Sequence, residues 1–247
     1  MGAPSCSDRS WGTGASWALW SAVPDDAPGV ALHEAGHSFQ QLADEYTDVG
    51  EDCGEYPEVN TTADALHTNG KWEHWLGFDA VDATGVQCIF QGSAMCRFGE
   101  PQYRSSQNSM MNSLYGENKN TSFNAVSREK IIMDIWRVVR PIDAAEPEAG
   151  DVPAPITLKV YVVDPSVISV DWSLDGELIA TDAGPAYDVA AAGLATGTHV
   201  ITARAYDNAD DSWVRARSGR CIDEAHCWNR DAWKNSEQSV SWSVNVP

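Results

Sequence analysis

The chain has 247 residues, of which 16 are Lys or Arg and 36 are Asp or Glu, so its formal charge is −20 at pH 7. The length allows one or two domains, and a 43% hydrophobic content with 11 Trp is enough to build a core. The negative charge, which both halves share, argues against nucleic acid and anionic membrane surfaces as partners. No apolar run is long enough for a membrane span, and the oligomeric state is left open.

The first half of the chain is expected to contain a strand and two helices. Residues 16–23 are typical of a strand, and the acids and proline of residues 25–28 form a helix start. The buried face of this first helix is expected to consist of four apolar residues at helical spacing: Leu32, Ala35, Phe39 and Leu42. A second helix is expected over residues 126–139, and the segment between the two helices is rich in loop residues.

Six cysteines indicate disulfide bonds and an oxidising compartment. Their spacing favours two local pairs, Cys88 with Cys96 and Cys221 with Cys227. We therefore expect a secreted, extracellular or cell-surface protein, although the N-terminus lacks the basic and apolar stretches of a signal peptide.

The second half has the pattern of short β-strands. Residues 143–155 have no apolar periodicity and several prolines, which is typical of a linker. Apolar and polar residues alternate over 168–174 and 240–246, and Asp175-Gly176 is a hairpin turn signal. These features predict an antiparallel β-sandwich of immunoglobulin-like type over residues 156–247.

One motif in the first helix predicts metal chemistry. In His33-Glu34-Ala35-Gly36-His37 the two histidines are about 40° apart around a helix and about 6 Å apart along it, so both imidazoles can reach one ion. Glu34 lies beside the first histidine, where it can polarise a water without binding the metal itself. Two neutral histidines, a third protein ligand and an open position are the arrangement of zinc hydrolases.

The third ligand must come from beyond this helix. A continuous helix would place Asp44 about 10 Å past His37, too far to share an ion. We therefore expect the helix to end near Gln40 or Gln41 and the chain to turn back, so that Asp44 or Glu45 can bind the metal. Residues 44–58 are acidic and contain no Lys or Arg, which leaves a solvated loop and a calcium (Ca²⁺) site as alternatives there.

The segment from His33 to Tyr46 resembles the signature of the IgA-peptidase (igalysin) family of metzincin metallopeptidases. Three later segments resemble the same family in the same order: Lys71 to Trp75, Tyr103 to Met111, and Phe123 to Ile132. The β-rich half is similar to the sandwich that often follows in this family. The resemblance implies an α+β chain with a metzincin-like zinc-peptidase catalytic domain over residues 1–142, a linker over 143–155 and an immunoglobulin-like β-sandwich over 156–247.

The resemblance also implies roles for single residues. His33 and His37 are implied zinc (Zn²⁺) ligands, and Glu34 is the implied general base and acid. Met111 is the implied Met-turn residue, an apolar floor beneath the metal, and Met110 is the alternative for that position.

For the third ligand the resemblance favours Asp44 over Glu45. The chain departs from the family at Gln40, where a glycine is common. Few residues precede the first helix, so we expect the upstream sheet of the catalytic domain to be incomplete.

Together these features predict a zinc-dependent endopeptidase that hydrolyses peptide bonds of extracellular proteins, with a protein or peptide as substrate. Tyr103, Tyr115 and Arg104 are candidates for stabilising the oxyanion. The alternative is a catalytically impaired remnant that serves as an adhesion or binding module with a structural metal. The presence of Glu34 argues against this alternative, because a structural zinc site needs no base.

Overall fold

The computed structural model describes residues 27–48, 53–66, 70–80, 84–97, 99–113, 119–215 and 233–247. The chain divides into two compact units, residues 1–134 with 211–229 and residues 135–210 with 230–247. The division falls inside the second helix, before the predicted boundary at residue 142. The predicted strand over 16–23 and the Cys221–Cys227 pair lie outside the described residues. No described helix is long and apolar enough to span a membrane.

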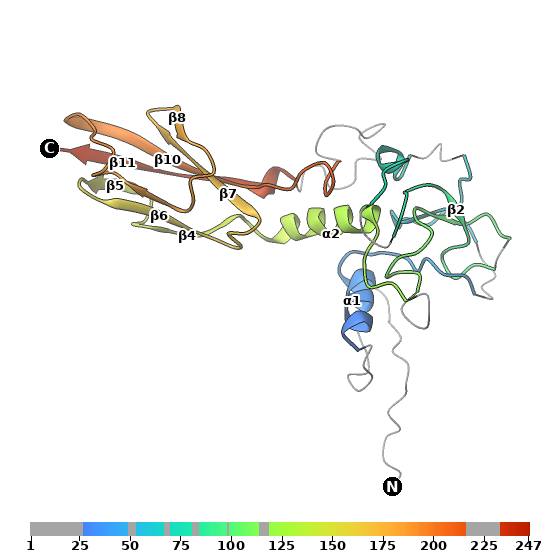
Figure 1. The fold of residues 1–247 in the computed structure, drawn as a ribbon. Helices are drawn as coiled ribbons and strands as arrows, with labels where there is room; N and C mark the ends of the chain where they lie inside the picture. The colour runs from blue at the N-terminus through green and yellow to red at the C-terminus, as the bar shows by residue number, and fades with distance from the viewer. Residues whose placement is uncertain are drawn as a thin grey trace, which may run out of the picture. The chain divides into compact units, whose positions relative to one another are not determined.

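The first unit holds little regular structure. Helix α1 (Ala27–Ser38) is followed by a 3₁₀ turn, η1 (Glu73–Trp75), and helix α2 (Ala125–Val138) begins in this unit. Three two-residue strands form an antiparallel sheet in the order β1-β3-β2: β1 (Thr61–Thr62), β3 (Tyr103–Arg104) and β2 (Phe90–Gln91). The two predicted helices are therefore present, and long loops connect the elements between them (Figure 1).

Helix α1 buries a different face from the predicted one. Leu32 is 53% exposed and Phe39 is 47% exposed, whereas His33 and Glu34 are buried. The helix approaches its neighbours most closely at Gly36, where an added Cβ would lie 3.0 Å from the sulfur of Met111. The prediction for Leu32 and Phe39 is wrong because the side of α1 that bears the motif, and not its most apolar side, packs against the rest of the unit.

The core of the first unit lies between η1, the start of α2 and the loop that follows α1 (residues 39–48, the ligand loop). Its buried members are Leu42, Val59, Trp72, Trp75, Met111, Ala125 and Val126, with Phe78 and Phe123 packed against them. Both tryptophans satisfy their indole N–H groups, Trp72 with the Cys88 carbonyl at 3.0 Å and Trp75 with Glu129 Oε2 at 2.8 Å. Each large aromatic ring buries enough apolar area to contribute about 3 kcal/mol or more.

A segment from the second half of the sequence completes the first unit. Val214 is fully buried, and the backbone N–H of Arg215 donates to Glu129 Oε1 at 2.6 Å. The Arg215 guanidinium lies over the Trp75 ring, 4.6 Å from its centroid, and donates to the His74 carbonyl at 3.0 Å. The connection that leaves the predicted sandwich near residue 207 is therefore part of the core around η1.

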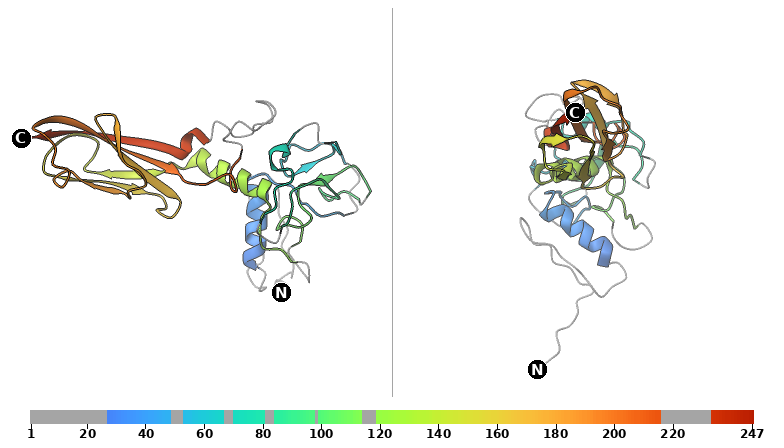
Figure 2. Two further views of the ribbon diagram at one scale, coloured as in Figure 1. Left: turned by 45° about the horizontal axis from the view of Figure 1, so that its top comes forward. Right: turned by 90° about the vertical axis from the view of Figure 1, so that its left-hand side faces the viewer.

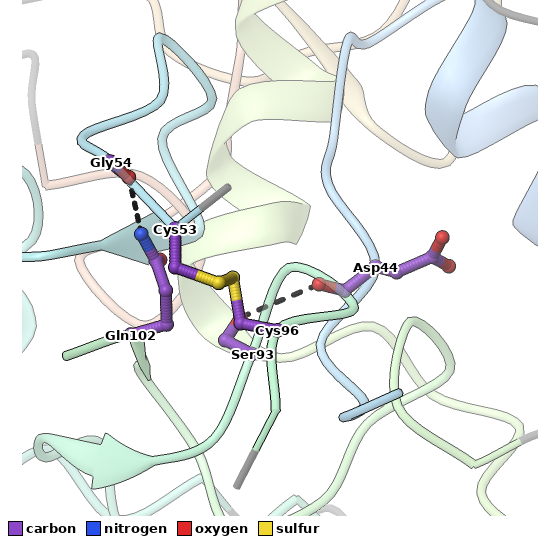
Figure 3. Close-up of a disulfide and its surroundings, with 6 residues drawn as sticks. All are labelled: Asp44, Cys53, Gly54, Ser93, Cys96 and Gln102. Carbon is purple, nitrogen blue, oxygen red and sulfur yellow. Dashed lines mark hydrogen bonds between the residues drawn. A yellow bond between two sulfur atoms is a disulfide. The ribbon is translucent and has the colours of Figure 1, made fainter. Parts of the chain in front are cut away.

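A disulfide joins Cys53 to Cys96 in the first unit (Figure 3), and Cys88 is an exposed free thiol. The predicted pair of Cys88 with Cys96 is therefore wrong. Cys88 donates its backbone N–H to the Ser105 carbonyl at 2.7 Å, so it is held in the chain that leads into β2. Sequence proximity favoured the local pair, but the intervening strand separates the two residues.

The second unit is a two-layer arrangement of strands (Figures 1 and 2). The five-stranded sheet has the order β5-β11-β10-β7-β8 and the three-stranded sheet the order β4-β6-β9. The strands of the first sheet are β5 (Gly150–Pro153), β7 (Ile168–Leu174), β8 (Glu177–Ala180), β10 (Gly197–Asp207) and β11 (Glu237–Val246). Those of the second are β4 (Ile142–Glu146), β6 (Thr157–Val162) and β9 (Ala186–Asp188). A second 3₁₀ turn, η3 (Lys234–Ser236), precedes β11.

Stacked aromatic rings join the two sheets. The Trp172 ring of β7 stacks on Trp242 of β11 at 5.9 Å between centroids and on Tyr187 of β9 at 5.4 Å. The predicted hairpin turn is present, since Asp175 and Gly176 both have positive φ and connect β7 to β8. The alternation in the sequence thus correctly predicted strands β7 and β11.

The predicted linker is wrong, because residues 143–155 contain strand β5 and most of β4. β4 pairs with β6, and β5 pairs with β11 in parallel, so the larger sheet is not wholly antiparallel. Prolines are tolerated here because β5 is an edge strand, where a missing N–H removes no ladder bond. The composition typical of a linker was in fact that of an edge strand.

Candidate metal centre

The ligand loop begins where α1 ends. The helix ends at Ser38, and the Leu42 N–H then donates to the Gly36 carbonyl at 3.0 Å. Gln41 has φ 53°, so the left-handed residue that turns the chain back is Gln41, directly after the predicted departure at Gln40. A side chain in this conformation costs about 1–2 kcal/mol. The turn-back inferred from helix geometry is therefore present.

The turn brings the three predicted ligands together. Asp44 Oδ1 lies 3.2 Å from His33 Nε2 and 3.2 Å from His37 Nε2, and the two nitrogens are 3.1 Å apart. Ligand atoms about 2.0–2.1 Å from a tetrahedral zinc ion are separated by about 3.3 Å. Two imidazole nitrogens and one carboxylate oxygen also form a donor set that zinc accepts. The three side chains thus fit a zinc ion in both spacing and chemistry.

Backbone carbonyls fix the orientation of both histidine rings. His33 Nδ1 donates to the Met110 carbonyl at 3.1 Å, and His37 Nδ1 donates to the Leu42 carbonyl at 2.6 Å. A carbonyl oxygen only accepts, so each Nδ1 carries a proton and the lone pair of the neutral ring lies on Nε2. Hydrogen bonds of this kind orient histidines that bind metals.

The charges of the site favour a cation among these atoms. Burial acts to raise the pKa of Asp44, but hydrogen bonds from His33 and His37 outweigh it and lower the pKa to about 2. Burial acts to lower the pKa of His37, but the hydrogen bond to Asp44, the hydrogen bond to the Leu42 carbonyl and the nearby negative charges together outweigh it, so this pKa is raised. Asp44 is therefore ionised at neutral pH, and a proton or a metal ion compensates its charge.

Glu34 is buried beside this group, and its Oε2 accepts no hydrogen bond within the described part of the chain. Burial raises the pKa of Glu34, while the charges of His33 and His37 act to lower it. A buried carboxylate oxygen without a partner is costly, and it usually marks a functional group or a missing ligand. Its position fits that of a general base next to the metal.

Glu45, the alternative third ligand, points away from the histidines. It is fully buried, and its carboxylate accepts hydrogen bonds from Asn60, Ser109 and Asn124. Sequence reasoning missed all three donors, since no spacing rule relates them to the metal motif. Asn60 and Asn124 lie 15 and 79 residues from Glu45 in the sequence, and only the fold brings them to one carboxylate.

Met111, the implied Met-turn residue, packs against α1. It is fully buried, and its sulfur approaches α1 between the two histidines, at Gly36. Met110 instead supplies the carbonyl that orients His33. The two neighbouring methionines thus make different contacts, Met111 with its side chain and Met110 with its backbone carbonyl.

Two of the three predicted oxyanion candidates, Tyr103 and Arg104, form strand β3. Arg104 is committed to backbone carbonyls of Gln91, Gly92 and Gln107, and Tyr115 lies outside the described residues. The hydroxyl of Tyr46 donates to the Met95 sulfur at 3.7 Å, and burial together with the nearby Asp44 carboxylate raises the pKa of Tyr46. Tyr46 is thus a phenol close to the three ligands, and its place two residues after Asp44 was the available signal.

The acidic loop does not form a second metal site among the described residues. Among the described residues, His33, His37 and Asp44 form the only group of three or more His, Cys, Asp or Glu side chains whose ligand atoms lie close together. Glu55 instead forms an ion pair with Lys71 at 2.5 Å and accepts hydrogen bonds from Thr62 and the Ala63 N–H.

Comparison with known protein families matches residues 141–203 to the family described as Bacterial Ig domain. The second unit contains an immunoglobulin-like domain. This agrees with its two-layer sheets and with the predicted sandwich. A comparison with curated proteins gives no match.

Two solved structures are similar over parts of the chain. SGBP-B of the mixed-linkage glucan utilization locus of Bacteroides ovatus, in complex with a mixed-linkage heptasaccharide, is 14% identical with a TM-score of 0.23. That match covers 44% of this chain and 22% of the other, so the chain spans about a fifth of that protein. The fibronectin(III)-like modules of CbhA from Clostridium thermocellum are 19% identical with a TM-score of 0.24, and the match covers 42% of this chain and 93% of theirs.

Proposed function

We propose that this chain is a zinc-dependent endopeptidase that cleaves extracellular proteins. The observation that carries the proposal is the convergence of His33, His37 and Asp44, whose ligand atoms lie 3.1–3.2 Å apart. The buried, unpartnered carboxylate of Glu34 beside them supports a catalytic role over a purely structural one. The resemblance of residues 33–46 to the IgA-peptidase signature agrees with this proposal.

The chemistry follows from the positions of these side chains. A bound zinc ion would polarise a peptide carbonyl and lower the pKa of water at its open position. Glu34 would accept the proton of the attacking water and pass it to the leaving amine, since its Oε2 is free to do so. The Met110 and Leu42 carbonyls keep the two histidine rings in the binding orientation, and Met111 excludes water below them.

We also infer that the protein acts outside the cytoplasm. The Cys53–Cys96 disulfide requires an oxidising compartment, and the bacterial Ig domain over 141–203 supports a location at or beyond the cell surface.

A second candidate function is a binding module with a structural metal. The immunoglobulin-like domain favours it, because such domains serve in binding as well as in linking. In that case Glu34 would have no role beyond packing, and its replacement would leave every property of the protein nearly unchanged.

Cleavage of denatured casein distinguishes the two functions. Wild-type protein should cleave casein, a zinc chelator should stop cleavage, and a non-chelating isomer of the chelator should not. The Glu34→Gln variant keeps the shape of the side chain and the metal ligands, so it should bind zinc and lose cleavage by about 10²-fold or more. Zinc-bound wild-type protein without cleavage of any unfolded substrate would favour the binding module.

A further inference from the structure

We propose that Glu45 is a positioning residue of the metal centre. Its carboxylate fixes the loop that carries Asp44 relative to the segment that orients His33. This inference rests on the proposed zinc site and extends it to a residue that does not touch the metal. Glu45 is fully buried, and burying a carboxylate is unfavourable unless hydrogen bonds compensate it.

Three neutral side chains supply that compensation. Ser109 Oγ donates to Glu45 Oε2 at 2.6 Å, and Asn60 Nδ2 donates to Oε1 at 3.0 Å. Asn124 Nδ2 lies 2.8 Å from Oε1 and 3.0 Å from Oε2. All three donors are fully buried. Both carboxylate oxygens are thus held from several directions, which leaves the side chain one position.

Two of these donors are themselves tied to other elements. Asn60 makes two hydrogen bonds to the backbone of Ala43: its Oδ1 accepts from the Ala43 N–H at 2.9 Å, and its Nδ2 donates to the Ala43 carbonyl at 2.8 Å. Asn124 caps α2, because its Oδ1 accepts from the Ser127 N–H at 3.0 Å. Glu45 therefore anchors the residues that flank Asp44 to the start of α2.

The third donor extends the network to the Met-turn and to His33. Ser109 Oγ accepts from the Met111 N–H at 3.1 Å, and the Glu45 N–H donates to the Met111 carbonyl at 2.7 Å. The carbonyl of Met110, between these residues, accepts from His33 Nδ1 at 3.1 Å. One buried carboxylate thus sets the positions of a ligand on the loop and of the orienting partner of a ligand on α1.

The test compares two buried glutamates of the first unit. Glu45→Gln removes the charge and replaces one acceptor oxygen by a donor that faces other donors. Glu129→Gln is the matched control, because Glu129 is also fully buried and accepts from His74, Trp75 and Arg215 instead. The measurements are zinc affinity by competition with a chromophoric chelator, the visible spectrum of the cobalt-substituted protein, and the Tm without metal.

Glu45→Gln should weaken zinc binding by about 10–100-fold and alter the cobalt spectrum. Glu129→Gln should lower the Tm and leave affinity and spectrum as in wild type. If Glu45→Gln fails to fold, Ser109→Ala removes the hydrogen bonds to Glu45 Oε2 and from the Met111 N–H, keeps the other donors to Glu45, and should weaken zinc binding by a smaller factor.

Unchanged affinity and spectrum in the folded variant, or an equal loss in the Glu129 control, would overturn the role of Glu45 alone. Wild-type protein that binds no zinc would contradict the proposed metal centre itself.

Discussion

Asp44 Oδ1 lies 3.2 Å from His33 Nε2, although α1 ends six residues before Asp44. The left-handed residue Gln41 reverses the chain and makes this contact possible. This contact adds a carboxylate ligand to the two histidines of α1, so the site has three ligands, one of them negatively charged.

Replacement of Asp44 by Asn should therefore weaken zinc binding more than it weakens the fold. The amide is isosteric but neutral, so the site loses its only anionic ligand. We expect zinc affinity to fall by about 10²-fold or more, measured by competition with a chelator. The same affinity in Asp44→Asn and wild type would exclude Asp44 as a ligand.

Zinc binding should depend on pH through His37. The pKa of His37 is raised in the metal-free protein, because its hydrogen bonds and the nearby negative charges together outweigh burial, so its proton is retained to higher pH than usual. Zinc must displace that proton. Apparent affinity should therefore rise with pH through the pKa of His37, by about tenfold per pH unit for each displaced proton, and then level off. Asp44, with a pKa of about 2, adds no dependence near neutrality. Isothermal titration in buffers of different ionisation enthalpy measures the protons released, and no release near the pKa of His37 would contradict this.

Reduction of the Cys53–Cys96 disulfide should loosen the ligand loop. The turn that ends at Cys96 holds Asp44, since the Ala94 N–H and Ser93 Oγ both contact the Asp44 carbonyl, at 2.8 and 3.4 Å (Figure 3). The Cys53→Ser/Cys96→Ser variant should lose about 2–4 kcal/mol of stability in denaturant unfolding and bind zinc more weakly. Cys88→Ser is the matched control and should change neither property, because that thiol is exposed and free.

How much of the site the sequence predicts depends on the range of the interactions. His33, Glu34 and His37 follow from helix geometry alone, and the reversal toward Asp44 follows from the length of the chain beyond the helix. Glu45 is different: a burial pattern cannot separate one buried acid from its solvated neighbours, and its hydrogen-bond donors lie far away in the sequence.

The fold was predictable to a similar degree. Strand alternation identified β7 and β11, and capping and periodicity identified both helices. Periodicity misplaced the buried face of α1, because contact with Met111 and not apolar area decides which side packs. Cysteine pairing is a long-range property. Proximity in the sequence therefore predicted Cys88 as the partner of Cys96, whereas in the structure the partner is Cys53.

The Arg215 segment predicts that residues 1–142 do not form a complete unit. Arg215 stacks on Trp75 and Phe78, 4.6 and 4.4 Å from the ring centroids, and closes one side of Glu129. Arg215→Ala should lower stability by about 1–3 kcal/mol in chemical denaturation. Arg204→Ala, at an exposed ion pair with Glu237 in the second unit, is the control and should cost about 1 kcal/mol or less. Equal losses would contradict a structural role for the segment.

The zinc content of the purified protein tests the metal centre most directly. Wild-type and His37→Ala protein are loaded with excess zinc and dialysed extensively against metal-free buffer. The number of zinc ions per chain is then measured by elemental mass spectrometry. Wild-type protein should retain about one zinc ion per chain, and His37→Ala should retain almost none while still folding. Absence of zinc from folded wild-type protein, or equal zinc in both proteins, would contradict the assignment of His33, His37 and Asp44 as a zinc site.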